Sequence, residues 1–83
     1  MSGLVLYSRQ GCHLCEVLLE ELLPRIRGRQ SLEILDIDTR EDLRNTYNDR
    51  VPVLEFDGRL VCQYTLDVRA LERCLQESTK NTA

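Results

Sequence analysis

The sequence predicts an α/β fold: one domain, residues 1–83, in which a four-stranded mixed sheet is flanked by three helices in the order β-α-β-α-β-β-α. Short apolar runs, a leucine-rich stretch with helical spacing, and an Asp57-Gly58 dipeptide between two later runs lead to this prediction. The chain has 83 residues, of which 42% are hydrophobic and 30% charged. This composition and length fit one globular domain and not a disordered chain.

The first predicted strand leads into a helix. Residues 4–7 are short and continuously apolar, as expected of a strand buried on both faces. The next stretch places apolar side chains along one helical face, at Cys15, Leu18, Leu19, Leu22, Leu23 and Ile26. Pro24 lacks a backbone donor and should kink or end this helix, and Gly28 can stop it.

Residues 32–37 form the second predicted strand, followed by a short helix. Thr39 can cap this helix, since Asp42 stands three residues later in a capping-box arrangement. Because a helix joins the first two strands, they should run parallel with a right-handed crossover.

The last two strands should form an antiparallel hairpin. Residues 51–56 and 59–64 flank Asp57-Gly58, which is a strong signal for a two-residue turn. The final helix follows, capped by Thr65 or Asp67.

The last predicted helix has apolar residues along one side, and the segment after them is polar. Its apolar positions are Leu66, Val68, Leu71, Cys74 and Leu75. Residues 78–83 are polar, and we expect them to fray.

Charge and hydropathy exclude several classes of partner. With 11 basic and 14 acidic residues, the net charge of −3 argues against a nucleic-acid partner. No apolar run approaches the roughly 20 residues that span a bilayer, so we expect no membrane partner. Residues 1–3 lead directly into a strand without the features of a signal peptide, which predicts a reducing cytoplasm.

The segment Cys12-His13-Leu14-Cys15 carries the chemistry. Cys12 stands where a strand ends and a helix begins, and the amide groups and positive dipole end of the helix favour a thiolate there. Cys15 lies one turn further on, close enough to form a disulfide with Cys12. This spacing in a cytoplasmic protein indicates dithiol–disulfide chemistry.

Over residues 3–77 the chain resembles a glutaredoxin of the thioredoxin superfamily, and in its small size the glutaredoxin-like proteins of bacteria. The resemblance rests on Leu6-Tyr7-Ser8 before Gly11-Cys12-His13-Leu14-Cys15, on Val51-Pro52-Val53 and on Asp57-Gly58. It implies a thioredoxin-like fold with strand order 2-1-3-4. It also implies that Cys12 is the nucleophile and Cys15 the resolving thiol, and that Pro52 follows a cis peptide bond. The backbone of Val51 would pair with an extended substrate.

Three further side chains are candidates for the same site. His13 either adds a positive charge beside the Cys12 thiolate, lowering its pKa, or is an exposed first-turn residue without a role. Arg9 either meets an anionic group such as a glutathione carboxylate or is a solvated loop residue. Asp67 stands where glutaredoxins carry an acidic glutathione contact, although their Gly-Gly pair is absent here.

These residues predict a thiol–disulfide oxidoreductase with no bound cofactor and no metal. Its substrate would be a disulfide-containing protein or a glutathione mixed disulfide, and its electron donor glutathione or a thioredoxin-type system. We expect a monomer. Two alternatives stay open: an iron–sulfur or metal carrier using Cys12 and Cys15, and a thioredoxin-fold binding module without catalysis. Cys62 and Cys74 fit core packing better than a second redox pair.

Overall fold

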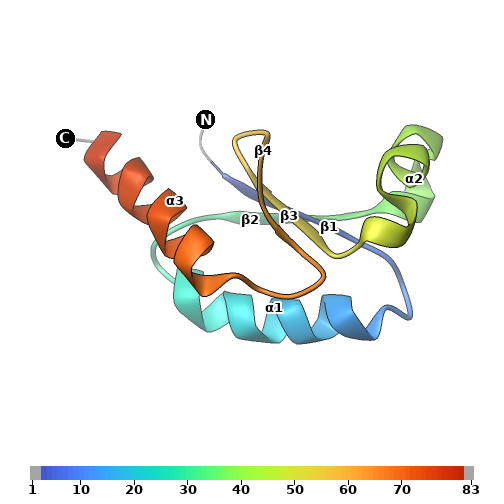
Figure 1. The fold of residues 1–83 in the computed structure, drawn as a ribbon, viewed down its shortest axis with the longest axis horizontal. Coiled ribbons are helices and arrows are strands. Elements are labelled where there is room, and N and C mark those ends of the chain that lie inside the picture. The colour runs from blue at the N-terminus through green and yellow to red at the C-terminus, as the bar shows by residue number, and fades with distance from the viewer. Residues whose placement is uncertain (1–2, 82–83) are drawn as a thin grey trace.

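The structure is a computed structural model that describes residues 3–81, with side chains through Glu77 (Figure 1). Its strands are β1 (Leu4–Ser8), β2 (Leu32–Asp36), β3 (Val53–Phe56) and β4 (Arg59–Gln63). Its helices are α1 (His13–Ile26), α2 (Glu41–Tyr47) and α3 (Val68–Asn81), and the short 3₁₀ turns η1 (Ile37–Thr39) and η2 (Asn48–Arg50) flank α2. The predicted element order is confirmed.

The strand order is β2-β1-β3-β4, as predicted. β1 runs parallel to β2, with Ser8 opposite Asp36, and antiparallel to β3, with Tyr7 opposite Val53. The carboxyl ends of β1 and β2 therefore meet the beginning of β3 at one end of the sheet. The loop that carries the cysteines, turn η1 and the Val51–Pro52 segment all lie at this end because the topology requires it.

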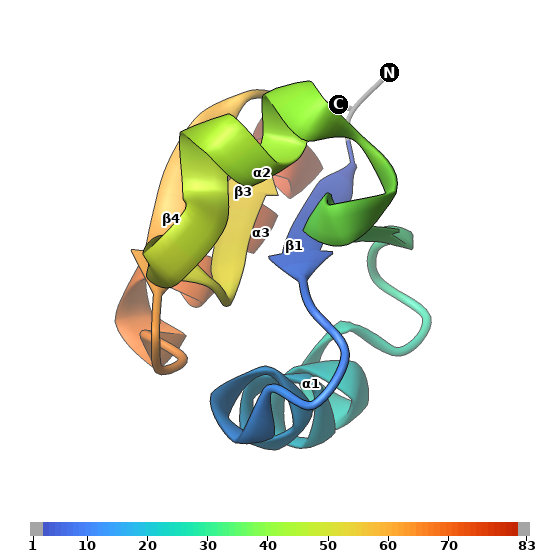
Figure 2. The ribbon, with the colours of Figure 1, turned by 90° about the vertical axis from the view of Figure 1, so that its right-hand side faces the viewer.

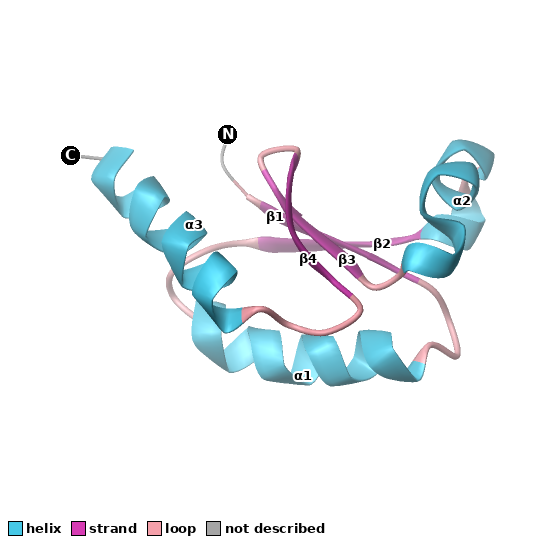
Figure 3. Cartoon of the chain, in the orientation of Figure 1, coloured by secondary structure: helices cyan, strands magenta, loops and turns pink. Residues whose placement is uncertain are grey.

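The main core lies between the sheet and the two long helices. Figure 3 shows α1 and α3 along one side of the sheet, and Figure 2 shows α2 across the other side. The fully buried side chains of this core include Leu4, Leu6, Leu18, Leu22, Leu54 and Leu71. Each such leucine contributes about 1.5–3 kcal/mol through the apolar surface it removes from water.

The C-terminal end of α1 follows the Gly28 signal but not the Pro24 signal. α1 runs through Pro24 and ends at Ile26, so the proline does not stop it. Gly28 follows the C-cap Arg27 with φ of +75°, a left-handed conformation that glycine adopts without a steric penalty. The β3–β4 turn is similar, since Asp57 and Gly58 both have positive φ, as the predicted two-residue hairpin turn requires.

The predicted capping of the second helix is wrong. Thr39 ends η1, and its hydroxyl donates to the Asp36 carbonyl 2.6 Å away instead of capping α2. The Asp36 carboxylate accepts from the Asp38 amide at 2.9 Å, which closes a tight turn directly after β2. α2 therefore begins only at Glu41, with Arg40 at its N-cap and no side-chain cap.

The start of β3 and the burial of β1 also differ from the sequence-based expectations. β3 begins at Val53 and not at residue 51, since the proline at 52 has no amide to donate to a ladder. β1 is fully buried on one face only, because Val5 and Tyr7 are half-buried. The expected frayed tail, residues 78–83, overlaps the end of α3, and residues 82–83 lie outside the described part.

Candidate active site

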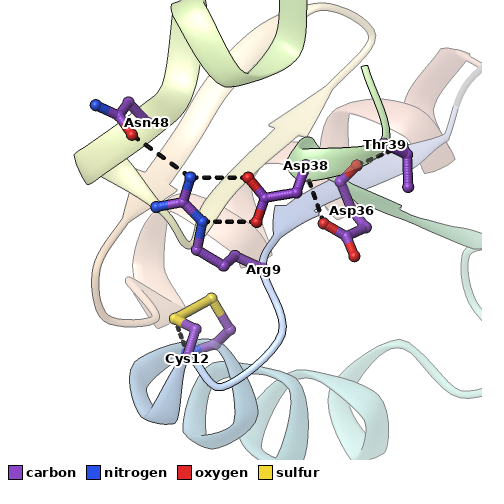
Figure 4. Close-up of polar contacts among 7 residues, drawn as sticks. Arg9, Cys12, Asp36, Asp38, Thr39 and Asn48 are labelled. Carbon is purple, nitrogen blue, oxygen red and sulfur yellow. Dashed lines mark hydrogen bonds and ion pairs between the residues drawn. A yellow bond between two sulfur atoms is a disulfide. The ribbon is translucent and has the colours of Figure 1, made fainter. Parts of the chain in front are cut away.

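Cys12 and Cys15 meet at the first turn of α1. Cys12 is the N-cap residue, and its Sγ accepts a hydrogen bond from the Cys15 amide at 3.1 Å. The two residues form a disulfide, drawn in yellow in Figure 4, and their Cα atoms are 5.2 Å apart. A sulfur at the N-cap accepts from an otherwise open helix amide, which favours its anionic form once the disulfide is reduced.

The two sulfurs differ in how far solvent reaches them. Cys12 is half-buried, whereas Cys15 is only 4% exposed. An external disulfide can therefore approach Cys12 and not Cys15. This asymmetry suits a pair in which one thiol attacks and the other resolves.

The Val51–Pro52 segment packs against the dithiol. Its peptide bond is cis, and both residues are buried. Val51 forms a small apolar cluster with Cys15 and Ile37. The Pro52 carbonyl accepts from the Tyr64 amide at 2.9 Å, which ties this segment to the end of β4.

The Arg9 side chain is bound by other residues of the chain. Its Nε and one terminal nitrogen donate to the two carboxylate oxygens of Asp38 at 2.9 and 3.0 Å, a bidentate pair visible in Figure 4. The same terminal nitrogen makes a longer contact of 3.5 Å to the side-chain oxygen of Asn48. The guanidinium lowers the pKa of the Asp38 carboxyl through this hydrogen bond, and the same bond raises the pKa of Arg9. The pair is therefore held charged.

Two tyrosines lie beside the dithiol. The rings of Tyr7 and Tyr47 stack with centroids 4.1 Å apart and planes 18° from parallel, and both pack against the cluster that contains Cys15. The Tyr47 hydroxyl donates to the Glu55 carboxylate at 3.0 Å. Burial, followed by hydrogen bonds to Tyr7 and Glu55, raises the pKa of Tyr47, so this phenol stays protonated. Arg50 lies over the Tyr47 ring, 5.8 Å from its centroid.

The other predicted site residues have more ordinary surroundings. His13 is the exposed first residue of α1. The Asp67 carboxylate accepts from the Ala70 amide at 3.1 Å, so it closes the first turn of α3 as one of the two predicted caps. Whether His13 and Asp67 act on a substrate stays a prediction.

Cys62 and Cys74 are free thiols in a different environment. Cys62 belongs to the main core and the half-buried Cys74 packs against it. Burial raises the pKa of both thiols above the ordinary value. They are therefore poor nucleophiles near neutral pH, in contrast to what the helix end predicts for Cys12.

Asp38, Asn48 and Tyr47 belong to this site, although none of them was predicted to. A signal for Asp38 existed, because Arg9 directly follows β1 and Asp38 follows β2 by two residues. The carboxyl ends of neighbouring parallel strands meet, so opposite charges placed there will face each other. Asn48 and Tyr47 carried no comparable signal, since their positions depend on where α2 ends.

Among residues 3–81, no group of three or more His, Cys, Asp or Glu side chains is placed to hold a metal ion. Within the same range, no helix is both long and apolar enough to cross a membrane.

The strand order and the Cys-x-x-Cys pair opening α1 beside Val51–Pro52 define a thioredoxin-like fold of the glutaredoxin type. The family described as Glutaredoxin-like domain (DUF836) matches residues 3–76, and the chain belongs to this family. No curated protein sequence matches the chain.

Three solved structures are similar to this one. Protein Ne2328 from Nitrosomonas europaea, solved by NMR, is 39% identical over 87% of this chain and 88% of its own, with a TM-score of 0.76. Protein XcR50 from X. campestris, solved by X-ray methods, is 33% identical over 90% of this chain and 97% of its own, with a TM-score of 0.70. Oxidized glutaredoxin 2 from Chlamydomonas reinhardtii is 20% identical over 94% of this chain and 83% of its own, with a TM-score of 0.65, and it supports the fold alone.

Proposed function

We propose that this protein is a thiol–disulfide oxidoreductase of the cytoplasm that reduces protein or glutathione mixed disulfides. The Cys12 thiolate attacks one sulfur of the substrate, the substrate S–S bond breaks, and the released thiolate takes a proton. A mixed disulfide with Cys12 is left. The Cys15 thiolate then attacks the Cys12 sulfur and releases the second substrate thiol. Two electrons have passed to the substrate, and the protein holds the Cys12–Cys15 disulfide.

One observation carries this proposal: a reachable sulfur at the N-cap of α1 forms a disulfide with a buried sulfur one turn later. In a buried structural pair of cysteines, neither member meets solvent, so the pair would not consist of one accessible and one buried cysteine. Membership of a glutaredoxin-like family supports the same chemistry.

The neighbouring residues suggest how a substrate binds. Val51 precedes β3 and lies outside its ladder, which supports the proposal that its backbone pairs with an extended substrate segment by β-addition. Glutathione or a thioredoxin-type system is the proposed donor that reduces the pair again. We propose that the protein acts as a monomer, without a bound cofactor or metal.

Single-cysteine variants test the division of roles. Cys15→Ser should accumulate a mixed disulfide at Cys12, since nothing displaces the captured substrate, and turnover of a protein disulfide should fall by a factor on the order of 10² or more. Cys12→Ser should neither turn over nor form the adduct. Cys74→Ser, on α3, is the matched control and should keep full activity.

Adducts are identified by mass spectrometry after acid quenching. Adduct formation at Cys15 in the Cys12→Ser variant, at the rate seen for Cys12, would contradict the assignment. If neither cysteine reacts and the protein as isolated shows a visible charge-transfer absorption, the metal-carrier alternative replaces this proposal.

A further inference from the structure

The ion pair beside the dithiol bears on which disulfides the site accepts. Arg9 stands three residues before Cys12, and Figure 4 shows its side chain between the disulfide and the Asp38 carboxylate. A free arginine in this place would attract a carboxylate on an incoming substrate. Here both oxygens of Asp38 already occupy one edge of the guanidinium, formed by Nε and one terminal nitrogen.

The surroundings of Arg9 are acidic as well. Besides Asp38, the carboxylates of Asp36 and Asp49 lie close enough to raise the pKa of Arg9. Arg44 is the other cation near Asp38, whose pKa it helps to lower. With three carboxylates around Arg9 and Arg44, the immediate surroundings of Arg9 carry no surplus of positive charge. Arg50 is directed elsewhere, over the Tyr47 ring and toward the Gln63 side chain.

The contacts of Arg9 also have a positioning role. They join the loop before Cys12 to η1 through Asp38 and to η2 through Asn48. η2 leads directly into Val51–Pro52. A substrate carboxylate that took over Arg9 would have to break this link as well as compete with Asp38.

We propose that the Arg9–Asp38 pair determines specificity, by withholding the cation beside Cys12 from substrate carboxylates. The site then prefers disulfides whose neighbouring groups are neutral or cationic, as in a protein segment with basic residues, over anionic ones such as oxidised glutathione. This inference rests on the proposed function and adds a substrate class to it.

Three small disulfides that differ mainly in their terminal group test the proposal. Hydroxyethyl disulfide is neutral, cystamine is cationic and dithiodipropionate is anionic. The rate at which each oxidises the reduced protein is followed by counting free active-site thiols by mass spectrometry after alkylation. In each case Cys12 attacks, one probe thiol leaves, and Cys15 completes the oxidation as the second leaves.

The decisive quantity is the anionic-to-neutral rate ratio, compared between variants. The Cys12 thiolate repels an anionic probe in every variant, so this common effect cancels. Asp38→Asn frees Arg9 and should raise the ratio roughly three- to tenfold at low ionic strength, and added salt should abolish the gain. Asp42→Asn is the matched control, because it removes the same charge from an ion pair with Arg40 and leaves Arg9 bound. Its ratio should change less than twofold.

A second measurement needs no variant. With the unaltered protein, salt should leave the rate of dithiodipropionate unchanged or increase it, because screening weakens a repulsion. A rate that falls with salt would show that a free cation attracts the anion, and it would overturn the inference. So would equal ratios in Asp38→Asn and Asp42→Asn. If hydroxyethyl disulfide itself fails to react through Cys12, the proposed function fails and this inference fails with it.

Discussion

At the scale of single residues, the cysteines differ because their surroundings do. Cys12 caps a helix and is half-buried, whereas Cys62 lies in the apolar core, where burial raises the pKa of its thiol. His13 opens the same helix and is exposed, and we propose that it tunes Cys12 further. The proposed effect is electrostatic and therefore measurable.

Replacing His13 by alanine should raise the Cys12 pKa and lower the reduction potential of the dithiol. A protonated imidazole near an exposed thiolate is worth about 0.3–1 kcal/mol, which corresponds to roughly 0.2–0.7 pKa units and roughly 5–20 mV. Thiolate absorbance against pH and equilibration with a glutathione buffer measure the two quantities. Leu14→Ala, an uncharged change at the next position, is the control. Identical titrations for both variants would show that His13 has no role.

At the scale of elements, local sequence patterns predicted the helices and the hairpin. They did not predict contacts that depend on how separate segments are aligned in the fold. The helical spacing of apolar residues predicted α1 and the burial of Leu18, Leu22 and Ile26, and the Asp57-Gly58 turn predicted the hairpin. The same spacing placed Leu23 on the buried face, which is wrong, since Leu23 is exposed. The Thr39 cap was wrong because the side chain of Asp36, outside the motif, closes a 3₁₀ turn first. The Arg9–Asp38 pair was missed because 29 positions separate its members and only the alignment of β1 with β2 joins them.

Two adjacent leucines of α1 test this description of its buried face. Leu22 is fully buried, whereas Leu23 is 43% exposed. Leu22→Ala should lower the free energy of unfolding by about 2–5 kcal/mol through lost burial and the cavity left behind. Leu23→Ala should lower it by less than about 1 kcal/mol, since solvent already reaches that side chain. Urea denaturation measures both, and equal losses would contradict the orientation of α1.

At the scale of the whole molecule, charge pairs at the active-site end link stability to pH. The pKa values of Asp38 and Asp42 are lowered, chiefly by hydrogen bonds from Arg9 and Arg40. A lowered carboxyl pKa means that the unfolded chain takes up protons first as pH falls. The stabilisation is therefore present at neutral pH, begins to fade near the unfolded value of about 4, and is lost as pH passes below the folded-state values.

Urea midpoints between pH 7 and pH 2 check this sign. The urea concentration at the unfolding midpoint should decrease once the pH is below about 4. For Asp38→Asn this decrease should be less steep, because one of the two linked carboxyls is gone. The change is small, since both pairs are solvent-exposed. Parallel curves for the variant and the unaltered protein would show that Asp38 contributes nothing to acid sensitivity.

The proposed chemistry depends most on the charged state of the Cys12 sulfur, and the pH dependence of alkylation measures it directly. Reduced protein is treated briefly with iodoacetamide across a pH series, and modification at each cysteine is quantified by mass spectrometry. Cys62 and Cys74 serve as internal references in the same sample. The account predicts a midpoint for Cys12 well below the ordinary thiol value of about 8.5, with both references modified only at higher pH. A Cys12 midpoint at or above 8.5, indistinguishable from Cys74, would contradict it.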